Sequence, residues 1–112
     1  MKQRKFSQAI AMLEEILTKH STSFLRDKAL MKIAKLQTMM GDLEQAIVSY
    51  ERLITEFGDE SLLLDRARLG IAEIYDFHMK DRQKAIETYQ KLLEQSPNSI
   101  YAGQARQRIR RL

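Results

Sequence analysis

Apolar residues recur along this chain at intervals of three and four, the spacing that places them on one side of an α-helix. The clearest stripes begin at three Ala-Ile pairs, whose first residues are Ala9, Ala46 and Ala85. A large apolar or aromatic residue follows each of these alanines after four positions and again after eight. No segment alternates apolar and polar residues for long enough to indicate a strand. The pattern therefore predicts an all-α fold.

A second set of stripes alternates with the first. It begins at Ala29, Ala67 and Ala105, which stand 38 residues apart, and an isoleucine follows each of them after four positions. Asp and a basic residue precede the first two of these alanines. We call the helices of this second set A helices and those with the Ala-Ile pairs B helices. Self-similarity with a period near 38 predicts a helical repeat, because stacked helix pairs share a core that one pair cannot bury alone.

The breaks between the stripes place six helices in the order B-A-B-A-B-A. Gly41 and Gly58 can adopt the positive φ that ends a helix, and an Asp follows each of them to cap the next helix. Pro97 ends the fifth helix, whereas the break at Lys80 has no glycine and one extra residue. The predicted helices span residues 4–19, 23–40, 42–57, 60–78, 81–95 and 99–111.

These residues resemble the tetratricopeptide repeat family over nearly the whole chain. The B helices carry a small residue followed by an aromatic residue four positions later, at Ala46 and Tyr50 and again at Ala85 and Tyr89. The A helices carry isoleucine followed by alanine, and Pro97 matches the closing proline. The resemblance implies a right-handed α-solenoid in a single domain over residues 1–112. Its parts are a half repeat at 4–19, repeats at 23–57 and 60–96, and a terminal helix at 99–111.

The segment SPNSIYAGQARQRI is similar to the terminal repeats of bacterial envelope proteins, among them outer-membrane assembly lipoproteins and the accessory protein of the Tol-Pal system. For a bacterial source this similarity favours the periplasm or cell envelope, with the cytoplasm next. Composition leaves the compartment open.

The family resemblance also implies a function, which is the binding of a partner protein or peptide on the concave face lined by the A helices. An alternative for Met31, Leu69 and Phe77 is packing against neighbouring helices. The positions of the family's Lys and Asn clamp for a C-terminal carboxylate carry no Asn here, so capture of that kind is not expected. The candidate partner-binding residues are Lys28, Met31, Lys35, Thr38, Met39, Arg66, Leu69, Glu73, Asp76, Phe77, Gln104, Gln107 and Arg111.

Composition argues against catalysis and cofactors. The 112 residues include no cysteine, which excludes disulfides and cysteine zinc sites. The two histidines, His20 and His78, stand at predicted helix ends, where a cation favours the helix dipole. Phosphate-binding glycine motifs are absent. We therefore expect neither an enzyme nor a metal or cofactor site.

Two other functions stay open. The first B helix has no A helix before it, so one side of Ala9, Leu13 and Leu17 is expected to be partly open, for a second copy or for the rest of a longer array. The net charge of +4 has a cluster in ARQRIRRL that phosphates could contact, but Tyr101 is the only aromatic residue near it, so nucleic-acid binding is the weaker alternative. No apolar run is long enough to predict insertion into a membrane, and the start MKQRKFSQAI lacks the apolar region of a secretory signal.

Overall fold

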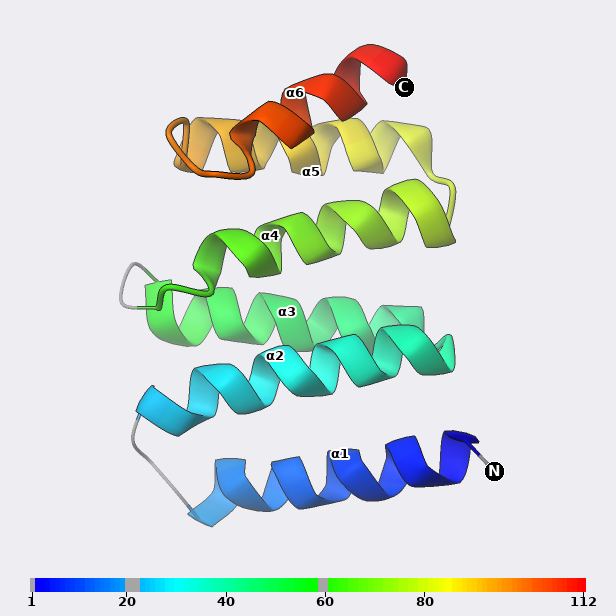
Figure 1. Cartoon of the computed structure of the whole chain (residues 1–112), viewed down its shortest axis with the longest axis vertical. Helices are drawn as coiled ribbons and strands as arrows, with labels where there is room; N and C mark the ends of the chain where they lie inside the picture. Colours follow the sequence, from blue (N-terminus) through cyan, green and yellow to red (C-terminus); the bar gives the residue numbers. More distant parts are fainter. Residues whose placement is uncertain (1, 20–22, 59–60) are drawn as a thin grey trace.

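The computed structural model describes residues 2–19, 23–58 and 61–112, and this part of the chain contains helices and no strand. Consecutive helices run antiparallel and stack along the longest axis of the molecule (Figure 1), whose extents are 41 × 33 × 17 Å. The all-α, six-helix prediction is confirmed. The elements are α1 (Lys2–Lys19), α2 (Ser23–Met40), α3 (Leu43–Phe57), α4 (Leu64–Glu73), the π-helical turn η2 (Ile74–His78), α5 (Arg82–Gln95) and α6 (Ala102–Arg111).

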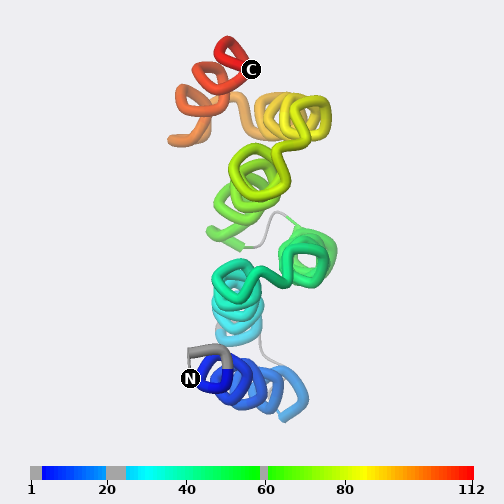
Figure 2. The backbone as a smooth tube through the Cα atoms, turned by 90° about the vertical axis from the view of Figure 1, so that its right-hand side faces the viewer, coloured from blue at the N-terminus to red at the C-terminus, as the bar shows by residue number. Residues whose placement is uncertain are grey.

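The helices form two layers. Figure 2 shows the A helices α2, α4 and α6 on one side and the B helices α3 and α5 displaced to the other. Small residues stand where the layers meet, since Ala46, Ala67, Ala85 and Ala105 are all fully buried. Large side chains such as Tyr89 fill the space between these close approaches. These four alanines, two from each set found in the sequence, are thus buried where helices approach closely.

A pair of hydrogen bonds explains why Asp precedes the first two A-helix alanines. The Ser61 hydroxyl donates to Asp27 at 2.8 Å, and the Ser96 hydroxyl donates to Asp65 at 2.5 Å. In each case a carboxylate in the first turns of an A helix holds the loop that leads to the next A helix. The bonds therefore tie successive repeats together at one edge of the stack.

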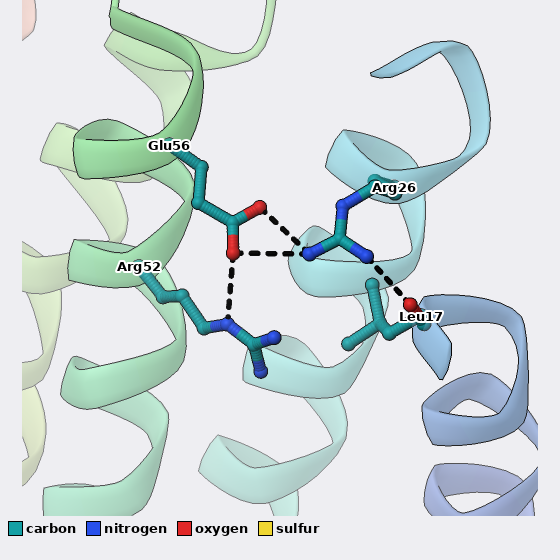
Figure 3. A network of polar contacts seen from close by, with 4 residues as sticks. All are labelled: Leu17, Arg26, Arg52 and Glu56. Atoms are coloured by element: carbon teal, nitrogen blue, oxygen red, sulfur yellow. Dashed lines mark hydrogen bonds and ion pairs between the residues drawn. The ribbon is translucent and has the colours of Figure 1, made fainter. Parts of the chain in front are cut away.

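Arg26 makes a further connection between three helices at the N-terminal end of the stack (Figure 3). Its guanidinium donates to the Leu17 carbonyl at 2.6 Å and to both carboxylate oxygens of Glu56, at 3.0 and 2.9 Å. Arg52 donates to the same carboxylate at 3.1 Å. Burial raises the pKa of Glu56, but the hydrogen bonds from Arg26 and Arg52 outweigh it and hold that pKa below its ordinary value. Arg26 thus binds a carbonyl group in the last turn of α1 and connects α2 to α3.

The second A helix ends in a π-helical turn, which the sequence pattern did not predict. The Met79 N–H donates to the Ile74 carbonyl at 2.8 Å, a bond that spans five residues in place of four. The turn accommodates an extra residue, because Ala67 and Ala85 are one residue farther apart than Ala29 and Ala46. The extra residue expected at the Lys80 break is therefore held inside the preceding helix.

Two A helices begin later than predicted. α4 begins at Leu64 in place of residue 60, and α6 begins at Ala102 in place of residue 99. The Ser61 hydroxyl oxygen accepts the N–H of the second residue after it at 3.0 Å, and Ser99 makes the equivalent bond at 3.1 Å. These bonds stabilise a turn before each of the two helices. The turn could not form if the helix began at the predicted residue. Asp59, the predicted cap of the second A helix, lies outside the described residues.

Candidate binding surface

The A helices α2 and α4, with η2 and one residue of α3, enclose a groove of about 300 Å³. We call it the A-face groove. Five of its lining residues were predicted from the sequence, namely Lys35, Thr38, Met39, Arg66 and Glu73. Four were not predicted, namely Tyr50, Gly70, Ile74 and His78. The groove thus joins residues that are far apart in the sequence.

Tyr50 is a buried member of the groove and packs on the backbone of α4. It is 3% exposed, and an added Cβ at Gly70 would lie 2.5–2.9 Å from carbons of its ring. Burial raises the pKa of the Tyr50 hydroxyl and the Glu73 carboxylate adds to the rise, whereas Arg66 and a hydrogen bond with Thr38 act against it. Charged side chains of the groove therefore lie close to this hydroxyl.

The accessible part of the groove combines charge with an apolar side chain. Arg66 and Glu73 form an ion pair of 3.3 Å along α4, with side chains 29% and 28% exposed. Lys35 is exposed and forms no ion pair with any described residue, and Met39 is 66% exposed. A partner that enters the groove meets a cation, an ion pair and a flexible thioether.

Met31 and Leu69 are core residues and do not reach this surface. They are 5% and 3% exposed and belong to the two buried apolar clusters. The alternative of packing against neighbouring helices is therefore correct for both. Spacing alone did not separate them from groove residues, because one face of an A helix also contacts the next helix.

Asp76 is also buried, which corrects its assignment to the groove. Its carboxylate accepts a hydrogen bond from the Tyr89 hydroxyl at 2.7 Å and two from Arg108, at 2.8 and 3.0 Å. The 38-residue period aligned Asp76 with Thr38, but Asp76 lies within the π-helical turn, and its side chain contacts Tyr89 of α5 and Arg108 of α6. Burial raises the pKa of Asp76, but the hydrogen bonds from Arg108 and Tyr89 outweigh it and hold that pKa below its ordinary value.

The other predicted residues lie outside the A-face groove. Phe77 is 49% exposed, and its ring centroid lies 4.9 Å from the guanidinium carbon of Arg108. Lys28 and Gln104 are exposed. Gln107 and Arg111 line a separate hollow of about 380 Å³ on α6. These residues stay predictions for contact with a partner.

Two further hollows lie on other parts of the surface. One, of about 460 Å³, is lined by α3, α4, η2 and α5, and its residues include Ile71, Tyr75 and Lys91. The other, of about 480 Å³, is lined mainly by α1. Ala9 and Leu13 line this hollow and are half-buried, as expected. Leu17 of the same helix is only 6% exposed, because α2 covers it.

Possible metal ligands do not gather in the described part of the chain. No group of three or more His, Cys, Asp or Glu side chains there could hold a metal ion. His78 lines the A-face groove, and His20 lies outside the described residues. None of the described helices is both long enough and apolar enough to cross a membrane.

Comparison with known proteins gives one match. A family model described as "Tetratricopeptide repeat" matches residues 28–59 and 66–99, more than half of the chain. Each matched segment contains most of an A helix and the B helix that follows it. No curated protein and no solved structure matches the chain. The similarity of the last repeat to bacterial envelope proteins stays a prediction.

Proposed function

The chain belongs to the tetratricopeptide repeat family, whose repeats generally mediate protein–protein interaction, and on this premise we propose that it binds a partner protein or peptide through the A-face groove. In this proposal the protein is a scaffold without catalytic activity, as its family is. The partner enters the groove as an extended segment or a helix with an apolar side chain.

The observation that carries this proposal is the composition of the groove. Met39 is exposed although it is apolar, and it stands beside the cation Lys35. An exposed methionine can adapt to different apolar side chains, while charged groups around it orient the partner. Tyr50 and Gly70 pack closely beneath, so the groove has a rigid base.

The test compares two double variants with equal change in net charge. Lys35→Glu with Arg66→Glu reverses two cations of the A-face groove, and Arg82→Glu with Lys91→Glu reverses two exposed cations of α5. Each variant and the parent are used as bait in a lysate of the source cell, and retained proteins are identified by mass spectrometry. Circular dichroism confirms that each variant is folded.

We expect the parent and the α5 variant to retain the same partner and the groove variant to lose it. Retention by all three proteins would place the binding surface elsewhere. Loss from both variants would show that net charge, and not the groove, governs retention.

Self-association is the second candidate, and the hollow on α1 favours it. Met12 is 70% exposed there, beside the half-buried Leu13 and Ile16. Light scattering over a range of concentrations tests this function, with Met12→Glu as the matched variant. A parent that is monomeric at high concentration excludes it, and a dimer that Met12→Glu dissociates supports it.

A further inference from the structure

The excess positive charge of the chain is concentrated on the A helices. Together α2, α4 with η2, and α6 carry ten Lys or Arg residues and four Asp or Glu residues. The whole chain has 19 and 15, so the B helices and the loops hold nine basic and eleven acidic residues. The A helices therefore carry a net charge of +6, whereas the rest of the chain carries a net charge of −2.

Hydrogen bonds and ion pairs within the molecule already engage every carboxylate of the A helices. Asp27 accepts from Ser61, and Asp65 accepts from Ser96. Glu73 pairs with Arg66, and Asp76 is buried beneath Arg108. The carboxylates of the A helices are thus all engaged in contacts within the molecule.

Several cations of the same helices are not engaged in this way. They are exposed and form no ion pair with any described residue, and they are Lys32, Lys35, Arg110 and Arg111. Lys35 and Arg111 occupy the same register, because the A helices repeat every 38 residues and Glu73 stands midway between them. They therefore belong to the side of the stack on which α2, α4 and α6 lie (Figure 2).

From this charge distribution we infer that the partner of the A-face groove is an acidic polypeptide segment. Its Asp and Glu side chains pair with Lys35 and Arg66 in the groove and with Arg111 in the separate hollow on α6, and an apolar side chain lies beside Met39. The inference rests on the proposed function of the groove. Charge complementarity of this kind selects a partner and speeds its association more than it adds affinity. It acts through side-chain carboxylates, so it needs no clamp for a C-terminus.

A polypeptide fits this surface better than a nucleic acid. Single-stranded nucleic acids bind with their bases stacked on accessible aromatic rings. Of the described aromatic side chains on the A helices, Phe77 already lies against Arg108, and Tyr75 lines the hollow between α3 and α5. The apolar Met39 in the groove also has no role in phosphate contact.

Glu73 has a defined place in this inference. Its carboxylate forms an ion pair with Arg66 at 3.3 Å and so occupies the place beside Arg66 that a partner's carboxylate would take. The internal ion pair therefore competes with the partner. Removing the charge with Glu73→Gln frees Arg66 and tightens binding, whereas a purely structural ion pair would give no gain.

The experiment is a selection of random peptides of about twelve residues, long enough in extended form to cross the groove. The library is panned against the parent, against Lys35→Glu with Arg111→Glu, and against the α5 control Arg82→Glu with Lys91→Glu. We expect peptides enriched on the parent to be rich in Asp and Glu around an apolar residue. Reversal of Lys35 and Arg111 should weaken their binding about tenfold and the α5 control should leave it within about twofold.

Two further measurements use one enriched peptide. Its dissociation constant should fall about threefold with Glu73→Gln and rise steeply between about 0.05 and 0.5 M NaCl, because the charges involved are exposed. A single-stranded oligonucleotide of the same length is measured beside it. Tighter binding of the oligonucleotide than of the peptide would overturn the inference, as would unchanged or weaker peptide binding to Glu73→Gln.

The selection separates failure of the inference from failure of the proposed function. Neutral or basic peptides that lose binding to Lys35→Glu with Arg111→Glu would overturn the acidic partner and leave the A-helix surface as the site. Peptides that bind this double variant as well as the parent would overturn both, and so would a selection that enriches no peptide.

Discussion

Tyr50 and Gly70 show how a single missing side chain shapes the groove. The ring of Tyr50 occupies the space where any other residue at position 70 would place its Cβ. Gly70 therefore matters for close approach and not for an unusual backbone angle, since it lies within α4. A glycine inside a helical stripe is a sequence signal of such a contact, and it points to one of the groove residues that spacing missed.

The first prediction concerns Gly70→Ala. Helix propensity alone would favour alanine by about 1 kcal/mol. Here the added methyl group meets the Tyr50 ring, and overpacking of a core typically costs about 1–3 kcal/mol. We expect a net loss in the free energy of unfolding, measured by urea denaturation. Gly103→Ala is the control, because nothing lies within 4 Å of its added Cβ; equal stability of Gly70→Ala and the parent would contradict the packing.

The second prediction concerns the buried carboxylate of Asp76. Because its folded pKa lies below the ordinary value, the carboxylate contributes stability at pH values above its unfolded pKa. That stability is lost as the pH falls through the folded pKa. The free energy of unfolding should therefore decrease from about pH 5 downwards, and Asp76→Asn should make this decrease shallower.

Urea denaturation between pH 2 and pH 7 checks this, with Asp42→Asn as a control at an exposed carboxylate that forms no ion pair within the described part of the chain. If Asp76→Asn and the parent lose stability equally over this range, the bonds to Tyr89 and Arg108 do not stabilise the fold.

At the scale of elements, the end of the second A helix departs most from the repeat. The first A helix ends at Gly41, with φ of 84°, whereas Lys80 takes the equivalent place with φ of 55°. Such a conformation costs a side chain about 1–2 kcal/mol. The departure follows the π-helical turn, which also contains Asp76, the residue that contacts Arg108 and does not line the predicted groove.

The third prediction is that Lys80→Gly stabilises the protein. Relief of the left-handed backbone outweighs the greater entropy of glycine in the unfolded chain, and the expected net gain is roughly 0.5 kcal/mol. Thermal unfolding measures it. Gly41→Ala is the converse variant, with open space around its added Cβ, so any loss there reports backbone strain alone. A melting temperature that falls in Lys80→Gly would contradict the assigned conformation.

At the scale of the whole molecule, the stack depends on contacts between successive helices. Figure 3 shows the clearest case, in which Arg26 links the end of α1 to Glu56 of α3. A solenoid has no single central core, so each such link stabilises its own part of the array. Loss of one such contact should therefore increase local unfolding at one end of the stack more than in the rest of the molecule.

The fourth prediction is that Arg26→Met lowers the free energy of unfolding by about 1–2 kcal/mol, because charge-assisted hydrogen bonds to two helices are lost while the apolar stem is kept. Amide hydrogen exchange should increase in α1 more than in α5. Arg52→Met is the control, since its ion pair with Glu56 lies on the surface of one helix and contributes less than about 0.5 kcal/mol. Uniform exchange along the chain would contradict a local role.

The sequence by itself determined the helical architecture. The repeat period, the alternation of two helix types and the glycine breaks are all visible in the spacing of residues along the chain, and so are the motifs of the family resemblance. Spacing along a helix decides which residues share a face. Five of the groove residues, Lys35 and Arg66 among them, followed from the family resemblance, which implies that the A helices line the concave face. The starts of α4 and α6 did not follow, because serine hydrogen bonds hold turns where periodicity continues.

Only the tertiary structure decided which residues of one helical face reach the surface. Met31 and Leu69 share a spacing with groove residues, yet the next helix covers them. Asp76 lies in the π-helical turn, and its carboxylate is buried against Tyr89 and Arg108 of the next two helices. Tyr50 joined the groove from a B helix because Gly70 leaves room for its ring. The spacing of residues shows which side chains share a face of one helix. Whether that face is buried depends on the other helices that pack against it.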